Sequence, residues 1–216
     1  MNTLPTLPPI WAEWLHTVLE ATATLAFALS GVLAAARKNL DLVGVCVVAF
    51  VTAFGGGTLR DILIDQRPFF WVQHVEFVWV LMAVCLVAVL FMHQRHVHPT
   101  ERALLWPDAM GLGMFTAVGV NPALAQGLPP LVAVMMGVTT SCLGGVLRDV
   151  LCNELPRALS DRSPYAACAF IGGWLYVGVI SMGLPPWIAL VLTVIFTAAL
   201  RLVAVWRGWQ LPAWNQ

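Results

Sequence analysis

The segment AFGGGTLRDIL, residues 53–63, places three consecutive glycines inside an apolar run and follows them with an arginine and an aspartate. Its central part, GGTLRDIL at 56–63, recurs as GGVLRDVL at 144–151, which sets an offset of 88 residues (144 − 56). One ungapped register over about fifty residues is more than shared hydrophobicity produces, so the chain is interpreted as a duplication. The same offset also pairs Phe27 with Phe115, Gly31 with Gly119, Leu40 with Leu128, Thr52 with Thr140, Pro68 with Pro156 and, conservatively, Glu20 with Asp108.

The composition is that of a membrane protein. Of the 216 residues, 60% are hydrophobic and only 10% are charged, whereas soluble domains have about 25% charged residues. The net charge of zero gives no reason to expect a nucleic-acid partner. The five cysteines lie in or beside apolar segments without a CxxC pair, and His93, His96 and His98 share a polar loop without ligands at suitable spacing. We therefore expect no metal site and no cofactor.

Seven apolar stretches are long enough to cross a bilayer, for which about 20 residues are needed. Short polar joins separate them, and none of these joins is long enough to form a soluble domain. The sequence therefore predicts an all-α integral membrane protein that forms a single membrane domain over residues 1–216. The predicted spans are 14–36, 40–64, 69–92, 103–123, 128–152, 164–183 and 186–206.

The distribution of basic residues predicts the orientation of the protein in its membrane. One side of the predicted topology has only Arg60 and Arg67. By the positive-inside rule the richer side is cytoplasmic, so we expect the N-terminus outside and the C-terminus in the cytoplasm. The richer side holds Arg37, Lys38, Arg95, Arg102, Arg148, Arg157, Arg162 and Arg207.

The duplication and the predicted spans together define the architecture. Three spans lie in each copy, at 14–92 and 103–183, and the seventh, at 186–206, has no counterpart. Because three is odd, the second copy enters the membrane from the opposite face, which predicts two inverted repeats plus a seventh helix. Such repeats are typical of transport proteins, and the sequence has no nucleophile elbow, metal triad or phosphate-binding loop. We expect a protein that is not an enzyme.

The glycines lie deep within the predicted second and fifth spans. Glycine tolerates backbone conformations that other residues avoid, and interruptions at matching positions of two inverted halves indicate a substrate or ion path. The alternative is that small residues only let helices pack closely. Because the pattern is repeated, and both times followed by Arg-Asp, we favour interrupted helices beside a path. The candidate positions are Gly55, Gly56, Gly57, Gly144 and Gly145.

Charged residues follow the glycines directly. A charge at the bilayer centre costs at least about 2.5 kcal/mol, and adjacent positions on a helix point about 100° apart. We therefore expect each arginine to find its partner elsewhere, and not in the next residue. An alternative for the second arginine is a side chain that extends to the cytoplasmic surface. The candidate pore or gating charges are Arg60, Asp61, Arg148 and Asp149, with Glu20 and Asp108 as partners or as groups that attract cations.

Hydroxyl side chains precede both glycine groups. They either offer oxygen atoms to a permeating species or bond to the backbone of their own helix, and the sequence does not decide between these roles. The residues are Thr52, Thr139, Thr140 and Ser141.

The doubled GG-[TV]-L-R-D motif, the join SGVLAAARKNLDLVGV at 30–45 and the terminal RLVAVWRGWQLPAW at 201–214 resemble the prokaryotic trimeric intracellular cation (TRIC) channel family. Its bacterial members are also catalogued as a glycine-transporter-like membrane family. The resemblance implies a homotrimer in membrane lipid, with a pore in each protomer lined by helices 2 and 5 kinked at the glycines. It further implies passive conduction of monovalent cations, chiefly potassium, with potassium or sodium as the permeant ions. The animal members' basic motif is replaced here by Arg-Asp, which argues against lipid regulation of their kind.

The predicted function is therefore that of a monovalent cation channel. The alternative is a carrier for a small zwitterion such as glycine, in which a half-helix N-terminus would hold the carboxylate. Both a channel and a carrier fit broken helices. They differ in whether two gates are ever open at the same time, which the sequence does not show.

Overall fold

The computed structural model describes residues 9–95, 100–160 and 163–211, and within these ranges every regular element is a helix. Seven helices have 16 residues or more, and two have four. Predicted residues that lie outside the described ranges are His96, His98, Arg162 and the last part of the terminal motif, 212–214. In chain order the helices are α1 (Pro9–Arg37), α2 (Leu42–Leu63), α3 (Phe70–Gln73), α4 (Val75–Arg95), α5 (Glu101–Ala125), α6 (Pro130–Leu151), α7 (Arg157–Ser160), α8 (Ala166–Ser181) and α9 (Pro186–Trp206).

Local sequence signals explain where several helices begin. The Asp41 carboxylate accepts a hydrogen bond from the Gly44 N–H at 2.7 Å before α2, and the Thr100 hydroxyl accepts one from the Ala103 N–H at 3.2 Å before α5. Both are N-caps of the usual side-chain type. Helix α9 begins with a proline at its first position, where no backbone N–H is needed.

The third predicted span, 69–92, was wrong as one helix. It is divided at His74, which has a non-helical backbone (φ −117°, ψ 64°), into the short α3 and the long α4. The later join contains a second unpredicted short helix, α7. Both short helices follow an Arg-Asp motif, and the aspartate of each motif contacts the first residue of the short helix that follows it.

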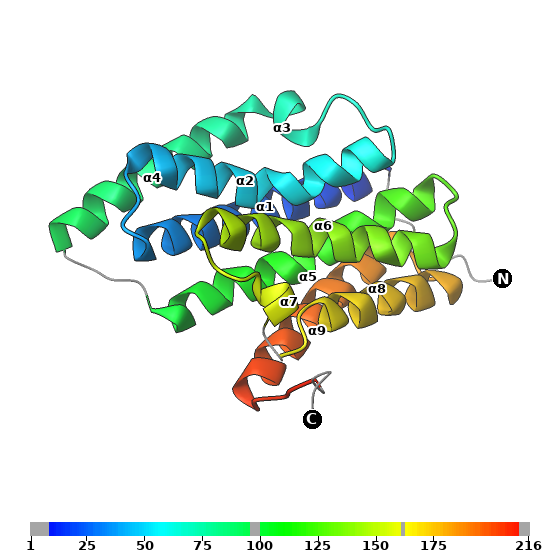
Figure 1. Cartoon of the computed structure of the whole chain (residues 1–216). Coiled ribbons are helices and arrows are strands. Elements are labelled where there is room, and N and C mark those ends of the chain that lie inside the picture. The colour runs from blue at the N-terminus through cyan, green and yellow to red at the C-terminus, as the bar shows by residue number, and fades with distance from the viewer. Residues whose placement is uncertain (1–8, 96–99, 161–162, 212–216) are drawn as a thin grey trace.

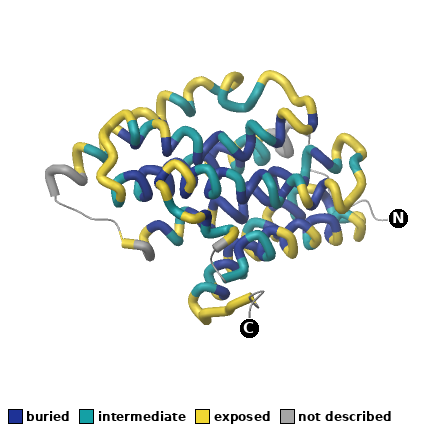
Figure 2. Tube along the Cα trace, in the orientation of Figure 1, coloured by how far each residue is buried: buried dark blue, intermediate teal, exposed yellow. Residues whose placement is uncertain are grey.

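The long helices pack side by side in a bundle (Figure 1). Helix α5 contacts α1, α6, α8 and α9, and α2 contacts α1, α4 and α6. Buried residues run along the middle of the bundle, whereas α3 and α4 at its edge are mostly exposed or half-buried (Figure 2). Phe27 and Phe115, which correspond at the offset of 88, meet in the interior with ring centroids 5.1 Å apart.

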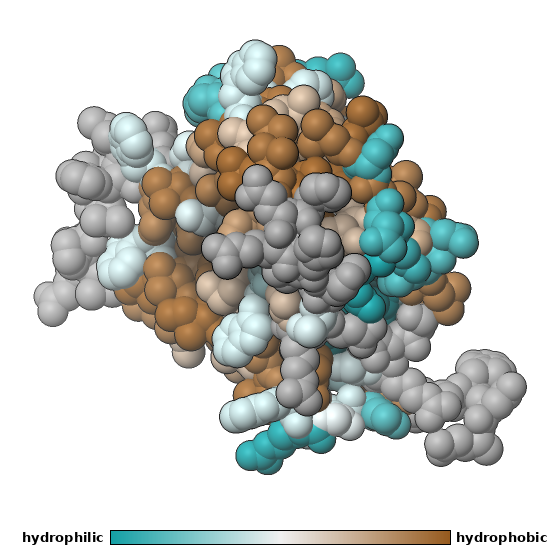
Figure 3. Space-filling view, turned by 90° about the vertical axis from the view of Figure 1, so that its left-hand side faces the viewer, coloured by the Kyte–Doolittle hydropathy of each residue, from teal (hydrophilic) through white to brown (hydrophobic). Residues whose placement is uncertain are grey.

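The surface and the helix lengths are those of a membrane protein. Apolar side chains cover broad areas of the face in Figure 3, and the hydrophilic residues gather in a few clusters. Among the described residues, five helical segments are long and apolar enough to cross a bilayer: Trp14–Arg37, Leu42–Leu63, Ala103–Ala125, Pro130–Leu151 and Pro186–Trp206. The apolar parts of α4 and α8, Val75–Phe91 and Ala166–Ser181, are shorter. Seven spans therefore stay a prediction.

Candidate functional site

Helices α2 and α6 run through their glycines without interruption. Each is helical over its full length, so neither helix is interrupted at its glycines, and a kink there stays a prediction. The glycines allow close packing: a Cβ on Gly56 would collide with the Thr140 carbonyl oxygen, and a Cβ on Gly144 would collide with the Thr52 carbonyl oxygen. These two contacts are related by the offset of 88 (140 − 52 and 144 − 56). The glycines thus let the backbones of α2 and α6 touch, which is the alternative that the sequence allowed.

The other three glycines have different surroundings. Gly55 is half-buried, and the atom nearest to a Cβ there would be the end of the flexible Leu147 side chain at 2.8 Å. Gly57 is buried with space beside it, because the nearest atom to a Cβ would be Glu20 Oε1 at 3.8 Å. At Gly145 a Cβ would meet the Tyr165 hydroxyl at 3.2 Å. The glycines of the motif therefore make a contact at one position and border charged side chains at the next.

One buried charge cluster, the α2-side network, consists of Glu20, Arg60 and Asp61. Arg60 Nη2 donates to Glu20 Oε1 at 2.7 Å and to Asp61 Oδ1 at 2.7 Å, and Arg60 Nε donates to Asp61 Oδ1 at 2.8 Å. The three residues are between 2% and 5% exposed. The network therefore joins α1 to α2 inside the bundle.

A second cluster, the α6-side network, consists of Asp108, Arg148, Asp149 and Ser30. Arg148 Nη1 donates to Asp108 Oδ1 at 2.5 Å and also to the Ser30 hydroxyl, and Arg148 Nε donates to Asp149 Oδ1 at 2.8 Å. All four residues are at most 3% exposed. This network joins α6 to both α5 and α1.

The networks show which residues are the partners of the two motif arginines. Glu20 and Asp108 are partners of the arginines, as their correspondence in the repeat suggested. The expectation that adjacent Arg and Asp do not pair was wrong, because the long arginine side chain folds back and its guanidinium reaches the next residue's carboxylate. Arg148 does not extend to the surface, because its side chain is 1% exposed.

Both motif aspartates also contact the start of one of the two short helices. Asp149 Oδ2 accepts a hydrogen bond from the Arg157 N–H, the first residue of α7, at 2.9 Å. Asp61 accepts one from the backbone N–H of Phe70, the first residue of α3. A carboxylate at a helix N-terminus satisfies amides that have no partner within the helix. The aspartate of each motif thus binds the motif arginine and also the first backbone amide of the short helix that follows.

The hydroxyl groups that precede the glycines mostly bond within their own helices. Thr52 donates to the Val48 carbonyl at 2.6 Å, Thr140 donates to the Met136 carbonyl at 2.6 Å, and Ser141 donates to the Val138 carbonyl at 3.2 Å. Thr139 is half-buried. In this structure Thr52, Thr140 and Ser141 bond to the backbone of their own helices, and a role for the hydroxyls in lining a path stays a prediction.

Several residues around the networks were missed by the sequence reasoning. His16 Nδ1 lies 3.8 Å from Glu20 Oε2. Arg201 of α9 is 2% exposed, donates to the Ser163 hydroxyl at 2.7 Å, and lies over the Tyr165 ring at 4.8 Å from its centroid. A signal for Arg201 was present, because it is a lone charge within an otherwise apolar span. Ser30 and Tyr165 carry no such signal.

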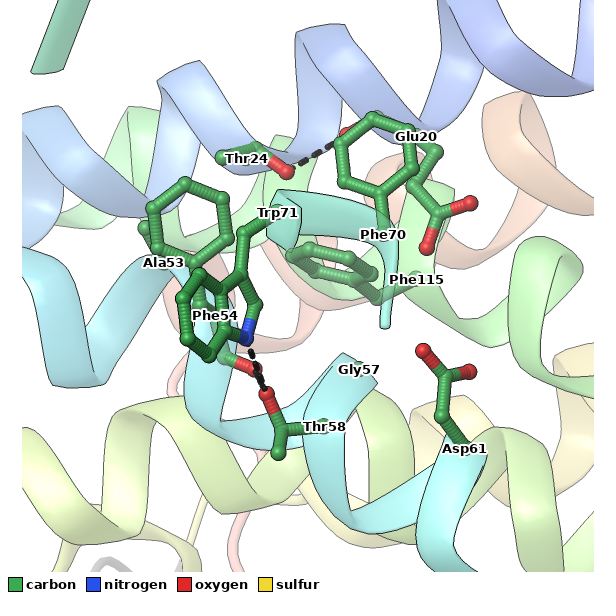
Figure 4. Close-up of a pocket in the computed structure, with 10 residues that line it drawn as sticks. All are labelled: Glu20, Thr24, Ala53, Phe54, Gly57, Thr58, Asp61, Phe70, Trp71 and Phe115. Atoms are coloured by element: carbon green, nitrogen blue, oxygen red, sulfur yellow. Dashed lines mark hydrogen bonds between the residues drawn. The ribbon is translucent and has the colours of Figure 1, made fainter. Parts of the chain in front are cut away.

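A small cavity adjoins the α2-side network (Figure 4). The carboxyl groups of Glu20 and Asp61 point toward the same space, and aromatic rings including Phe70 and Trp71 of α3 border it. Trp71 Nε1 donates to the Thr58 hydroxyl at 3.2 Å, which holds the indole in place. The volume of the cavity is about 10 Å³, which is room for one water molecule.

The ends of the bundle are joined by contacts outside the helices. Lys38 Nζ lies 2.9 Å from Glu154 Oε1, and this hydrogen bond holds the pKa of the Glu154 carboxyl below its ordinary value. At the position equivalent to Lys38, Gln126 (38 + 88) donates to the Ile64 carbonyl at 3.3 Å. Within the described residues no group of three His, Cys, Asp or Glu side chains is arranged to hold a metal ion.

Both halves of the chain match one known sequence family. The sequence profile of the family described as glycine transporter matches the chain twice, over residues 17–93 and 105–181. The two matched segments are 88 residues apart (105 − 17), the offset at which the two charge networks correspond. The chain belongs to this family.

Relatives and solved structures agree with that membership. This family member is 38% identical over 199 residues to a UPF0126 membrane protein of Vibrio cholerae, covering 90% of this chain and 81% of the relative. It is 36% identical over 195 residues to the UPF0126 inner membrane protein YadS of Escherichia coli, covering 90% and 93%. The crystal structure of the TRIC trimeric intracellular cation channel orthologue from Rhodobacter sphaeroides superposes with a TM-score of 0.81 at 33% identity, covering 89% and 98%. The family member therefore has the TRIC fold.

Proposed function

We propose that the protein is a channel for monovalent cations, mainly potassium, whose path runs through each protomer between α2 and α6. The observation that carries the proposal is the pair of arginine–carboxylate networks buried inside a membrane-spanning bundle. Ionisable groups in such positions are costly, and in membrane proteins they mark ion or substrate pathways. The likeness to a solved cation channel orthologue supports the same function.

The charge balance of the networks favours cations over anions. On the α2 side, two carboxyl groups of Glu20 and Asp61 surround one guanidinium. On the α6 side the ratio is the same for Asp108, Asp149 and Arg148. An excess of carboxyl groups beside a path lowers the energy of a cation and raises that of an anion.

The contact of α2 with α6 provides a gate in this proposal. Gly56 and Gly144 bring the two backbones together between the networks, so the path is open only when α2 and α6 move apart at this crossing. The glycines that the sequence suggested as kinks would then act as the place where the two helices separate.

The proposed assembly follows the family. We infer a homotrimer in the bacterial inner membrane with seven spans per protomer, two inverted three-helix repeats, the N-terminus outside and the C-terminus in the cytoplasm. The trimeric orthologue and the inner membrane relative support this assembly and location. The orientation depends on the basic residues, of which Lys38, Arg37 and Arg157 lie at one end of the bundle with Glu154.

The alternative is a carrier for a zwitterion such as glycine, which the name of the family suggests. A carrier needs a pocket of solute size that is closed to both sides. The cavity between Glu20 and Asp61 has room for one water molecule, which is too small for glycine with its five heavy atoms. This cavity therefore does not provide the solute pocket that a glycine carrier needs.

The test compares ion conduction with solute uptake in one preparation. In a planar bilayer under a potassium chloride gradient, the channel predicts discrete current steps that reverse near the potassium equilibrium potential. The Gly56→Leu, Gly57→Leu double variant should lose or change these steps. A silent bilayer together with saturable glycine uptake into liposomes would contradict the channel and support the carrier.

A further inference from the structure

The two networks are related by the repeat but are not equally complete. All three nitrogens of the Arg148 guanidinium group have partners: Nε and Nη2 contact Asp149, and Nη1 contacts Asp108 and Ser30. In Arg60, Nε and Nη2 serve both carboxylates, and Nη1 is buried without a hydrogen-bond partner among the described residues. A buried donor without an acceptor weakens the structure that holds it.

One position of the repeat differs between the two networks in a way that matches this difference. Ser30 of α1 provides the hydroxyl that accepts from Arg148 and that lies 3.5 Å from Asp108 Oδ1. The position equivalent to Ser30 in the second copy is Val118 (30 + 88), which has no polar side-chain atom. Val118 is fully buried within α5. The repeat therefore assigns position 118 to the α2-side network, where valine offers no acceptor of the kind that Ser30 offers to Arg148.

The two networks also differ in the number of helices that they join. Arg148 connects α6 with α5 through Asp108 and with α1 through Ser30. Arg60 connects α2 with α1 alone through Glu20, and the cavity beside Glu20 and Asp61 gives water room to compete for their oxygens. A pair that water reaches is easier to separate than a dry one, since the separated charges are then solvated.

We propose that the α2-side network is the latch that releases when α2 moves away from α6, and that Val118 keeps this latch weaker than its counterpart. The inference rests on the proposed function for its role in conduction, but the release itself is a movement that is measured without any current. The α6-side network, completed by Ser30, remains closed and keeps α6 fixed to α1 and α5.

The test uses a cysteine at Gly57, where the space beside Glu20 accommodates a side chain. In a background with the five native cysteines replaced, the rate at which a small neutral maleimide modifies Gly57→Cys reports how often the latch opens. Val118→Thr adds a hydroxyl at nearly constant volume, and we expect it to lower this rate about tenfold, as one added hydrogen bond to a charged group would. The matched control is Val120→Thr, which adds the same hydroxyl to α5 at another buried position and should leave the rate unchanged.

The reciprocal experiment keeps the proposal testable if the first variant does not fold. Ser30→Val should loosen the α6-side network and raise the modification rate of Gly145→Cys, while leaving that of Gly57→Cys unchanged. Equal effects of Val118→Thr and Val120→Thr, or no effect of Ser30→Val at Gly145→Cys, would overturn the proposal. If current steps are recorded but the variants do not change these modification rates, the latch is contradicted and the channel is supported. If the modification rates change as expected but the bilayer is silent, the latch is supported and the channel is contradicted.

Discussion

The α2-side and α6-side networks are built from the same motif, yet their arginines differ in the number of hydrogen-bond partners. Both place an arginine between the next residue and a carboxylate on the preceding repeat helix, Glu20 on one side and Asp108 on the other. On the α6 side the Ser30 hydroxyl is a further partner, and Arg201 of α9 and Tyr165, which precedes α8, lie nearby. The duplicated motif therefore gives both halves the same framework, and residues outside the motif add contacts on the α6 side.

The largest effect is expected from removal of an arginine. Arg148→Met leaves Asp108 and Asp149 buried without their partner, so we expect a loss of roughly 3–5 kcal/mol in the free energy of unfolding. Arg60→Met should cost less, because the network it breaks is incomplete. Thermal unfolding of the purified variants in detergent measures both.

A compensating variant tests whether the unpaired charge causes that loss. Arg148→Met combined with Asp108→Asn should recover part of the stability lost in Arg148→Met alone. A loss for Arg60→Met that equals or exceeds the loss for Arg148→Met would contradict the difference between the two networks.

The next effect concerns the helix crossing that both halves share. Gly56→Ala and Gly144→Ala each place a methyl group against a carbonyl of the other helix, and we expect each to lower the stability by about 1–3 kcal/mol. Gly57→Ala is the matched control, because the nearest atom to its Cβ is 3.8 Å away and alanine is the better helix former. Equal melting temperatures for Gly56→Ala and Gly57→Ala would show that the crossing is not as close as described.

The smallest effect distinguishes the two ends of the bundle. Lys38 holds the pKa of Glu154 below its ordinary value, so the ionised carboxylate is favoured by folding. This contribution is present above the pKa of the unfolded chain and is lost as the pH falls through the lower pKa of the folded protein. Both side chains are more than one-third exposed, so Lys38→Met should cost at most about 1 kcal/mol at pH 7.

The equivalent contact at the other end has no ionisable group. The effect of Gln126→Met, which removes the hydrogen bond to the Ile64 carbonyl, should therefore not depend on pH. The measurement is the melting temperature of both variants relative to wild type at pH 7 and at the lowest pH that the protein tolerates. A Lys38→Met deficit that persists unchanged in acid would contradict the pairing with Glu154.

The sequence predicted the framework because its signals repeat. The offset of 88 identified Glu20 and Asp108 as equivalents, and both proved to be partners of the motif arginines. Long apolar runs predicted most helix positions to within a few residues, and 186–206 agrees with α9 at both ends.

The rest depended on contacts that no local pattern contains. The glycines looked like helix breaks because the sequence does not reveal that a neighbouring backbone lies against Gly56 and Gly144. The return of each arginine to the next residue depends on its rotamer, which the spacing of Arg60 and Asp61 does not determine. The division of the third span at His74 follows from the hydrogen bond that Asp61 makes to the start of α3, a contact made only in the folded chain.

The most direct test of the account is the current through Gly57→Cys before and after reaction with a positively charged methanethiosulfonate, recorded under a potassium chloride gradient in a cysteine-free background. If cations pass along the Gly57 face of α2, the added charge should reduce the single-channel current and move the reversal potential away from the potassium equilibrium potential. Ile62→Cys, on the exposed apolar face of the same helix, should show neither change. An unchanged current at Gly57→Cys, or the same reduction at Ile62→Cys, would contradict a path beside the α2-side network.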